Sequence, residues 1–145
     1  MLDISPEIEK LADELCGRGH RCTAVVADVR DPASVAAAIK RAKEKEGRID
    51  ILVNNAGISE STPFPAYTEE LLDKVMDLNV KGVFNATRVA SEFMAARGEG
   101  VILSTSSMVS IYGQPSGVAY PASKFAVNGL TVSLARELGP KGDRK

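Results

Sequence analysis

The sequence predicts an α/β fold in which a parallel sheet lies between layers of helices. Helical and strand patterns alternate along the chain in the order αβαβαβα, with four helices and three main strands. Strands that are joined through helices run parallel, and their crossover connections are right-handed. No linker, repeat or low-complexity segment interrupts the alternation, and 145 residues suffice for one hydrophobic core. We therefore expect one domain over residues 1–145, with no separate substrate domain.

The first half of the chain carries two predicted helices and one predicted strand. The first helix is expected to begin with Ser5 as N-cap and Pro6 as first helical residue, and to end near Gly17. The apolar run 23–27 predicts a buried strand. The second helix is expected over 31–47, where an Asp-Pro pair starts it and a glycine stops it.

The second half continues the alternation. Residues 49–53 predict a strand, and a polar loop over 59–67 leads to a long helix over 68–97 that is capped by a threonine. A third strand is predicted over 101–103. A serine- and glycine-rich loop then leads to the last helix, over 120–138, which stops at a Gly-Pro pair.

Composition excludes several classes of partner. The chain is 44% hydrophobic and 26% charged with a net charge of −1, which favours neither nucleic acid nor an anionic membrane. No apolar run approaches the roughly 20 residues that span a bilayer, and residues 1–4 do not resemble a signal peptide. Two cysteines without a second pair predict neither a metal site nor a disulfide framework. We therefore expect a cytoplasmic protein without a metal.

Tyr120 and Lys124 form the most informative pair in the sequence. They lie four residues apart in a predicted helix and so share one helix face. A neighbouring cation favours the ionised form of a phenol and makes it a better proton acceptor. Ser107 lies on the loop upstream, so that one carbonyl could meet a phenol, an ammonium and a hydroxyl. Taken alone, this spacing also fits an exposed lysine beside a packed tyrosine.

Four motifs, in the same order along the chain, resemble those of the short-chain dehydrogenase/reductase family. They are Asp28-Val29, the run Asn54-Asn55-Ala56-Gly57, Asn79 in Leu78-Asn79-Val80, and Ser107 followed by Tyr120 and Lys124. The resemblance implies a Rossmann-like doubly wound parallel sheet. It also implies an NAD(P)-dependent oxidoreductase that interconverts a secondary alcohol and a ketone.

The resemblance assigns catalytic roles to four residues. Tyr120 would be the general acid–base group, and Lys124 would support it and hydrogen-bond the nicotinamide ribose. Ser107 would orient the substrate oxygen, although Ser104, Ser106 and Ser110 compete for this role. Asn79 would hold a water molecule that connects the lysine to solvent, through a local break in its helix.

The resemblance also assigns cofactor contacts. Asp28 would hydrogen-bond the adenine amino group while Val29 packs on the ring, and the alternative for Asp28 is a simple turn residue. Asn55, Ala56 and Gly57 would pass close to the adenosine ribose, whereas Asn54 would tie neighbouring strands together. Asp3 would accept hydrogen bonds from the ribose, which favours NAD over NADP. The alternative for this aspartate is a frayed terminal residue.

The same resemblance implies a sheet that is truncated at both ends. Residues 2–4 are similar to the end of the family's second strand, and the glycine-rich turn that cradles the pyrophosphate is absent. In a strand order of 3-2-1-4-5-6, losing strands one and two would remove the middle of the sheet and leave two buried edges unpaired. The charged run 141–145 stands where a further strand is expected. The sequence therefore favours a fragment of a longer reductase.

Substrate class and partners follow from these expectations. The nearest branches are the 3-oxoacyl-carrier-protein reductases and the sugar or polyol dehydrogenases. The apolar surfaces of residues 80–94 and 125–138 fit either a homodimer or homotetramer of the full-length form, or burial within the monomer. The alternative to an enzyme is a catalytically inactive remnant that at most associates with partner subunits.

Overall fold

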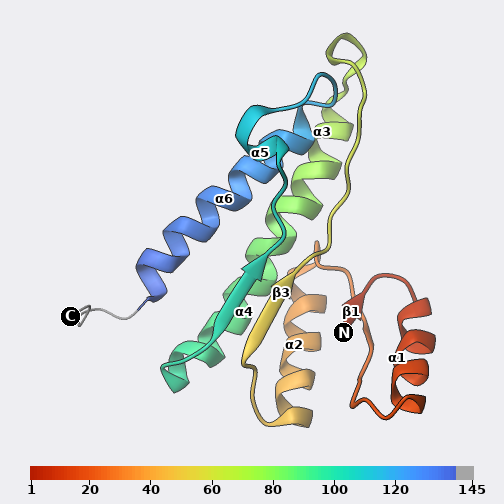
Figure 1. Ribbon diagram of the computed structural model, residues 1–145, viewed down its shortest axis with the longest axis vertical. Helices are drawn as coiled ribbons and strands as arrows, with labels where there is room; N and C mark the ends of the chain where they lie inside the picture. Colours follow the sequence, from red (N-terminus) through yellow and green to blue (C-terminus); the bar gives the residue numbers. More distant parts are fainter. Residues whose placement is uncertain (140–145) are drawn as a thin grey trace.

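The computed structural model describes residues 1–139, and the predicted charged run 141–145 lies outside the described residues. Strands and helices alternate as the sequence predicts (Figure 1). The strands are β1 (Leu2–Asp3), β2 (Val25–Val26), β3 (Ile51–Asn54) and β4 (Val101–Ser104). The helices are α1 (Glu7–Gly17), α2 (Pro32–Glu46), α3 (Glu69–Met76), a π-helical turn (Asp77–Lys81), α4 (Gly82–Arg97), α5 (Val109–Tyr112) and α6 (Ala119–Leu138), with a 3₁₀ turn at Phe64–Ala66. None of the helices within residues 1–139 is long and apolar enough to cross a membrane.

The strands form two separate pairs. β1 pairs in parallel with β2, with Leu2 opposite Val25, and β3 pairs in parallel with β4, with Ile51 opposite Val101. This confirms the predicted pairing of the second and third family strands. It also corrects one expectation, because the second strand is not wholly lost: its end remains as β1. The break in the sheet therefore lies between β1 and β3.

The core lies between α2 and α4 on one face of the strands. Val35 and Ile39 of α2 pack against Ala86 and Val89 of α4, and Leu2 and Leu52 are among the partly buried residues that pack on this cluster. The opposite face of the β3–β4 pair is uncovered in the described structure, since four strand residues there are 49–60% exposed. These residues are Ile51, Val53, Val101 and Leu103.

Cap chemistry fixes the helix ends. Asp31 caps α2 by accepting a hydrogen bond from Ala33 N at 2.9 Å, and Gly47 ends the helix with a left-handed φ of 81°. Thr68 caps α3 by accepting from Leu71 N at 3.3 Å. The predicted N-cap of α1 was wrong by one residue, because that helix begins at Glu7. The hydroxyl of Ser5 nevertheless accepts the Glu7 N–H at 3.3 Å.

Several elements differ in length from their predictions. β2 has two residues rather than five, and the predicted loops over 59–67 and 104–119 contain one 3₁₀ turn and the four-residue α5. Such single turns are too short to show an apolar repeat. The predicted helix over 68–97 is continuous from Glu69 to Arg97 but contains the π-helical turn.

Candidate active site

Tyr120 and Lys124 occupy the first turns of α6. The Lys124 side chain is buried, with 5% of the residue exposed, and its Nζ lies 5.8 Å from the centroid of the Tyr120 ring. Nζ donates a hydrogen bond of 2.6 Å to the carbonyl of Thr105, the residue that follows β4. The burial rules out the alternative of an exposed lysine. The bond holds the ammonium at the end of β4, beside the phenol.

Asn79 links the loop after β3 to α6. Its Oδ1 accepts from Ile58 N at 2.9 Å, and its Nδ2 donates to Ile58 O at 2.8 Å and to Ser123 Oγ at 3.0 Å. Ser123 Oγ in turn donates to the carbonyl of Tyr120 at 2.7 Å. Asn79 lies within the π-helical turn, which confirms the predicted local break in its helix. Such turns occur frequently at functional sites.

Gly57 marks the place where these groups meet. A Cβ atom built on Gly57 would lie 3.1 Å from Asn79 Oδ1 and 3.8 Å from Lys124 Nζ. The backbone after β3 therefore passes directly over the amide and the ammonium. A glycine allows this approach without displacing either group.

Ser107 lies on the loop between β4 and α5. Its hydroxyl makes one weak contact, accepting from Val109 N at 3.4 Å. The competing hydroxyls are more fully engaged: Ser106 donates to Asn128 Oδ1 at 2.6 Å, and Ser110 donates to the Ser107 carbonyl at 2.6 Å. Ser104 Oγ accepts a hydrogen bond from Asn54 Nδ2 at 3.3 Å, which confirms the expectation that Asn54 ties neighbouring strands together. Among the four serines, Ser107 thus has the hydroxyl most available to a substrate.

A cavity of about 440 Å³ collects the predicted cofactor residues. Six of the predicted cofactor-binding residues lie outside α6, and all six line the cavity: Asp3, Asp28, Val29, Asn55, Ala56 and Gly57. Tyr120 and Lys124 do not line this cavity, but Gly57 does, and Gly57 lies next to Lys124 Nζ. Asp3 accepts the Ser5 N–H at 2.8 Å, so its carboxylate is held in place rather than frayed.

Arg30 is a charged neighbour that sequence reasoning missed. Its guanidinium donates hydrogen bonds to Asp28 Oδ2, of 3.0 Å from Nε and 2.6 Å from Nη2. Arg30 also lines the cavity. The hydrogen bonds from Arg30 lower the pKa of Asp28, so this carboxylate is ionised and already partnered. The signal in the sequence was opposite charge two residues apart. An adenine amino group at Asp28 would share the carboxylate with this arginine.

Residues 1–143 match the sequence profile of the family described as short chain dehydrogenase. The chain belongs to this family. Among curated relatives it is 59% identical to Oxidoreductase UcpA of Escherichia coli K12, over 99% of this chain and 55% of that protein. It is 63% identical to a 3alpha-hydroxysteroid dehydrogenase of Mediterraneibacter gnavus, over 77% of this chain and 44% of that protein. It is 38% identical to the 3-oxoacyl-[acyl-carrier-protein] reductase FabG of Thermotoga maritima, over 98% and 58%.

Solved structures of short-chain dehydrogenases share the fold. An NAD+-bound xylitol dehydrogenase superposes with a TM-score of 0.92 at 31% identity, over 96% of this chain and 54% of that chain. A gluconate 5-dehydrogenase from Burkholderia cenocepacia, in complex with NADP and tartrate, gives 0.89 at 35% identity, over 94% and 54%. The predicted Rossmann-type fold is therefore confirmed. The chain spans about half the length of the proteins that it matches.

Proposed function

We propose that this protein is an NAD(P)-dependent oxidoreductase that interconverts a secondary alcohol and a ketone. The observation that carries the proposal is the buried Lys124 ammonium, 5.8 Å from the Tyr120 ring and directly beneath Gly57. A fixed cation beside a phenol suits that phenol to proton transfer at neutral pH. The 440 Å³ cavity that Gly57 also lines offers room for the adenosine part of a dinucleotide.

Each residue then has a distinct task. The nicotinamide cofactor, when bound, supplies or accepts the hydride. Tyr120 gives its phenolic proton to the substrate oxygen during reduction and takes it back during oxidation. Lys124 stabilises the phenolate and holds the nicotinamide ribose. Ser107 donates a hydrogen bond to the substrate oxygen as charge develops there, and Asn79 positions the water that returns the proton to the lysine.

We propose NAD as the preferred cofactor. The carboxylate of Asp3 is oriented by Ser5 N–H and lies on the cavity wall, where it can accept hydrogen bonds from ribose hydroxyls. A 2′-phosphate would be repelled there. Arg30 and Lys74 line the same cavity and would favour the phosphate, but the guanidinium of Arg30 is engaged by Asp28. Titration of the purified chain with NADH and NADPH, followed by nucleotide fluorescence, tests this preference.

The substrate class follows from what the relatives' names share. Steroid hydroxyl, 3-oxoacyl, xylitol and gluconate groups all present an alcohol or a ketone. We propose a secondary alcohol of the polyol or 3-hydroxyacyl kind. The loops over 58–67 and 108–119 would select among such substrates, because they flank Tyr120 and Ser107.

A pair of tyrosine variants tests the proposed chemistry. Tyr120→Phe removes the phenolic hydroxyl and should lower turnover of a ketone by about a hundredfold or more. Tyr112→Phe is the comparison variant: that tyrosine is 68% exposed in the loop over 108–119, so losing its hydroxyl should leave proton transfer intact and lower turnover far less than Tyr120→Phe does. Equal turnover by both variants would contradict the proposal.

The alternative is an inactive remnant that serves at most in subunit association. It is favoured by the break in the sheet beside the cofactor cavity. Failure of NADH to bind saturably to the folded chain would support this alternative. Saturable binding that is lost in Lys124→Ala would support the enzyme.

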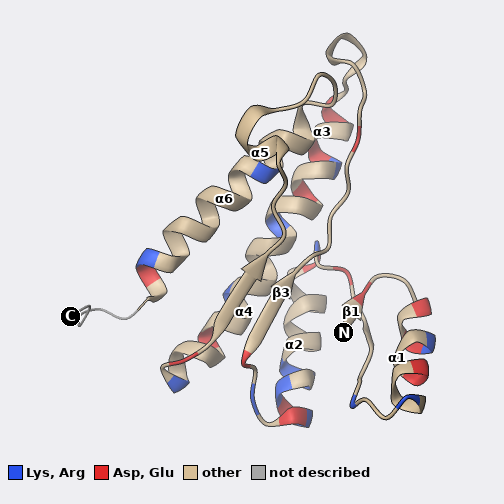
Figure 2. Ribbon diagram, viewed as in Figure 1, with Lys and Arg blue, Asp and Glu red and all other residues tan. Residues whose placement is uncertain are grey.

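We further propose that the full-length form is a homodimer or homotetramer that associates through α4 and α6. Figure 2 shows charged residues only near the two ends of α6. Phe84, Phe125 and Val132 are 49–61% exposed on these helices. Sedimentation of Phe125→Glu against the unmodified protein tests the interface. Fractionation of cells that express the tagged protein tests the cytoplasmic location expected from the sequence.

A further inference from the structure

Asn128 lies on α6, and its side chain hydrogen-bonds to the loop that carries Ser107. Its Oδ1 accepts a hydrogen bond of 2.6 Å from Ser106 Oγ, and its Nδ2 donates one of 2.9 Å to Ser110 Oγ. These two serines lie on either side of Ser107 in the sequence. One side-chain amide therefore holds the loop on both sides of the serine that is proposed to bind the substrate.

The hydroxyl protons of the two flanking serines are both engaged. A hydroxyl has one proton to donate. Ser106 donates its proton to Asn128, and Ser110 donates its proton to the carbonyl of Ser107 at 2.6 Å. The backbone N–H of Ser110 donates to the same carbonyl at 3.1 Å. The flanking hydroxyls thus fix the backbone of Ser107, whose own hydroxyl proton has no acceptor within residues 1–139.

Tyr120, Lys124 and Asn128 follow one another at intervals of four residues in α6. Residues at this spacing lie on the same face of a helix, and eight residues span about 12 Å along the helix axis. The helix face that carries the phenol and the ammonium therefore also carries the amide that holds Ser107. One helix fixes both of the groups, phenol and serine hydroxyl, that a substrate oxygen would contact.

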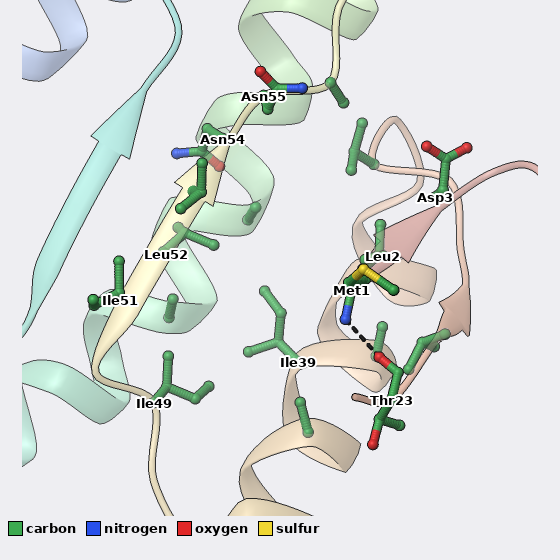
Figure 3. Close-up of a pocket in the computed structure, with 18 of the residues that line it drawn as sticks. Met1, Leu2, Asp3, Thr23, Ile39, Ile49, Ile51, Leu52, Asn54 and Asn55 are labelled. Carbon is green, nitrogen blue, oxygen red and sulfur yellow. Dashed lines mark hydrogen bonds between the residues drawn. The ribbon is translucent and has the colours of Figure 1, made fainter. Parts of the chain in front are cut away.

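β3 and Lys124 hold the beginning of the same loop. Figure 3 shows Asn54 at the end of β3, with its amide nitrogen directed toward β4. That nitrogen donates to Ser104 Oγ at 3.3 Å, and the carbonyl of Asn54 accepts from Thr105 N at 2.9 Å. Lys124 Nζ donates to the carbonyl of Thr105. Residues 104 and 105 are therefore held independently of Asn128.

The segment 106–112 depends on Asn128 for its attachment. Within residues 1–139, Asn128 is the only residue outside this segment whose side chain hydrogen-bonds to it. The segment contains α5, a single turn of four residues, which is too short to be stable by itself. Loss of the Asn128 amide should therefore let Ser107 move while Thr105 stays in place.

We propose that Asn128 is a positioning residue that sets the distance between the Ser107 hydroxyl and the Tyr120 phenol. The proposal rests on the oxidoreductase function proposed above, in which one substrate oxygen meets both groups. Misplacing a reacting group by about 1 Å can lower a rate by about a hundredfold. Asn128 hydrogen-bonds to neither side chain, so it acts through the backbone of Ser107.

The first test measures turnover of a ketone by the purified chain with NADH. Asn128→Leu removes both hydrogen bonds and keeps a branched side chain of similar length, and it should lower kcat by about ten- to a hundredfold. The KM for NADH should stay unchanged. Thr131→Val is the matched control, because the Thr131 hydroxyl bonds only to the Val127 carbonyl of the same helix, at 2.8 Å. This control should keep the kcat of the unmodified chain.

A double variant distinguishes positioning of Ser107 from general support of the fold. Ser107→Ala should itself lower kcat, because it removes the donor to the substrate oxygen. If Asn128 acts through Ser107, adding Asn128→Leu to Ser107→Ala should lower kcat little further. A double variant whose loss is the product of the two single losses would overturn the proposal.

Amide hydrogen exchange provides a readout that needs neither cofactor nor substrate. In Asn128→Leu the N–H of Ser110, whose acceptor is the Ser107 carbonyl, should exchange roughly tenfold faster than in the unmodified chain. Amides of α4 (residues 82–97) should keep their rates, which shows that the variant is folded. Unchanged exchange at Ser110 would overturn the proposal whatever the activity.

Failure of the positioning role and failure of the proposed function look different. If Tyr120→Phe and Ser107→Ala both lower turnover but Asn128→Leu does not, the oxidoreductase function stands and the positioning role of Asn128 is wrong. If the unmodified chain reduces no ketone, or if Tyr120→Phe and Ser107→Ala leave turnover unchanged, the function fails and the positioning role fails with it.

Discussion

Lys124 carries a buried positive charge that has one hydrogen-bond acceptor among the described residues. Its ammonium donates to the carbonyl of Thr105, and within residues 1–139 no carboxylate lies at ion-pair distance from it. Burying a charge costs free energy unless good partners compensate it. The buried ammonium of Lys124 therefore does not favour the folded state, and buried charges of this kind are typical of functional sites.

Replacing Lys124 by methionine should separate stability from function. The apolar chain fills the same space, so the free energy of unfolding should stay the same or rise by about 1 kcal/mol. NADH binding and ketone turnover should be lost. Chemical denaturation gives the first quantity and fluorescence titration the second. A large loss of stability would mean that this lysine is a structural residue.

Tyr67 is a second phenol with an unusual environment. Its hydroxyl donates to Glu60 Oε1 at 2.6 Å, and burial together with this carboxylate raises its pKa from 10.0 to about 12. Gln114 joins the same cluster by donating to the Glu60 carbonyl at 3.1 Å. The cluster joins the loop after β3 to the loop before α6, and so helps to fix the start of α6, where Tyr120 lies.

Alkaline titration should reveal Tyr67 directly. The folded-state pKa lies above the unfolded value, so the contribution of Tyr67 to stability is complete below about pH 10 and is lost as pH rises toward 12. Ultraviolet absorbance should show that one of the three tyrosines ionises late. Tyr67→Phe should remove that late step, and its persistence in the variant would refute the assignment.

At the scale of elements, the π-helical turn departs from regular α-helix geometry and places the side-chain amide of Asn79 in the interior. Asn79 is 1% exposed and makes three hydrogen bonds, two to Ile58 and one to Ser123. These bonds satisfy backbone groups of the loop after β3 that no strand reaches. The turn thereby connects β3, α4 and α6 at the place where Lys124 lies.

Two asparagine variants compare this turn with an ordinary helix position. Asn79→Ala leaves the N–H and C=O of Ile58 without partners and should lower the free energy of unfolding by about 2–4 kcal/mol. Asn85→Ala loses one bond, to the Val29 carbonyl at 3.0 Å, and should cost about 1 kcal/mol. Urea denaturation of both variants measures the difference. Equal losses of unfolding free energy would show that Asn79 stabilises the fold no more than an ordinary helix residue does.

The sequence predicted those elements whose signals are local. Asp31 and Thr68 could be identified as caps because their side chains bond to the helix that they precede. The break in the helix at Asn79 was expected from the motif of the family, and the π-helical turn confirms it, whereas the catalytic role of Tyr120 stays a prediction. The partnership of Arg30 with Asp28 depends on side-chain geometry, and the bond from Lys124 to Thr105 joins residues 19 apart. No local pattern specifies contacts of this kind.

At the scale of the whole molecule, the break in the sheet divides the chain unequally. α4 has eight buried residues, whereas α1 has one, Ala12. β2 contacts both β1 and α1, and these elements join the core through few apolar contacts, such as that of Leu2. Such a segment can open without unfolding the rest, because little apolar surface holds it.

Hydrogen exchange should therefore separate the two parts of the molecule. Amides of α1 (residues 7–17) should exchange at least about tenfold faster than those of α4 (residues 82–97), because α1 opens locally while α4 exchanges only on global unfolding. Mass spectrometry of peptides from the two helices measures the ratio, and low urea should accelerate α4 more steeply because global unfolding exposes more surface. Equal protection and equal urea dependence would mean that the chain unfolds as one cooperative unit.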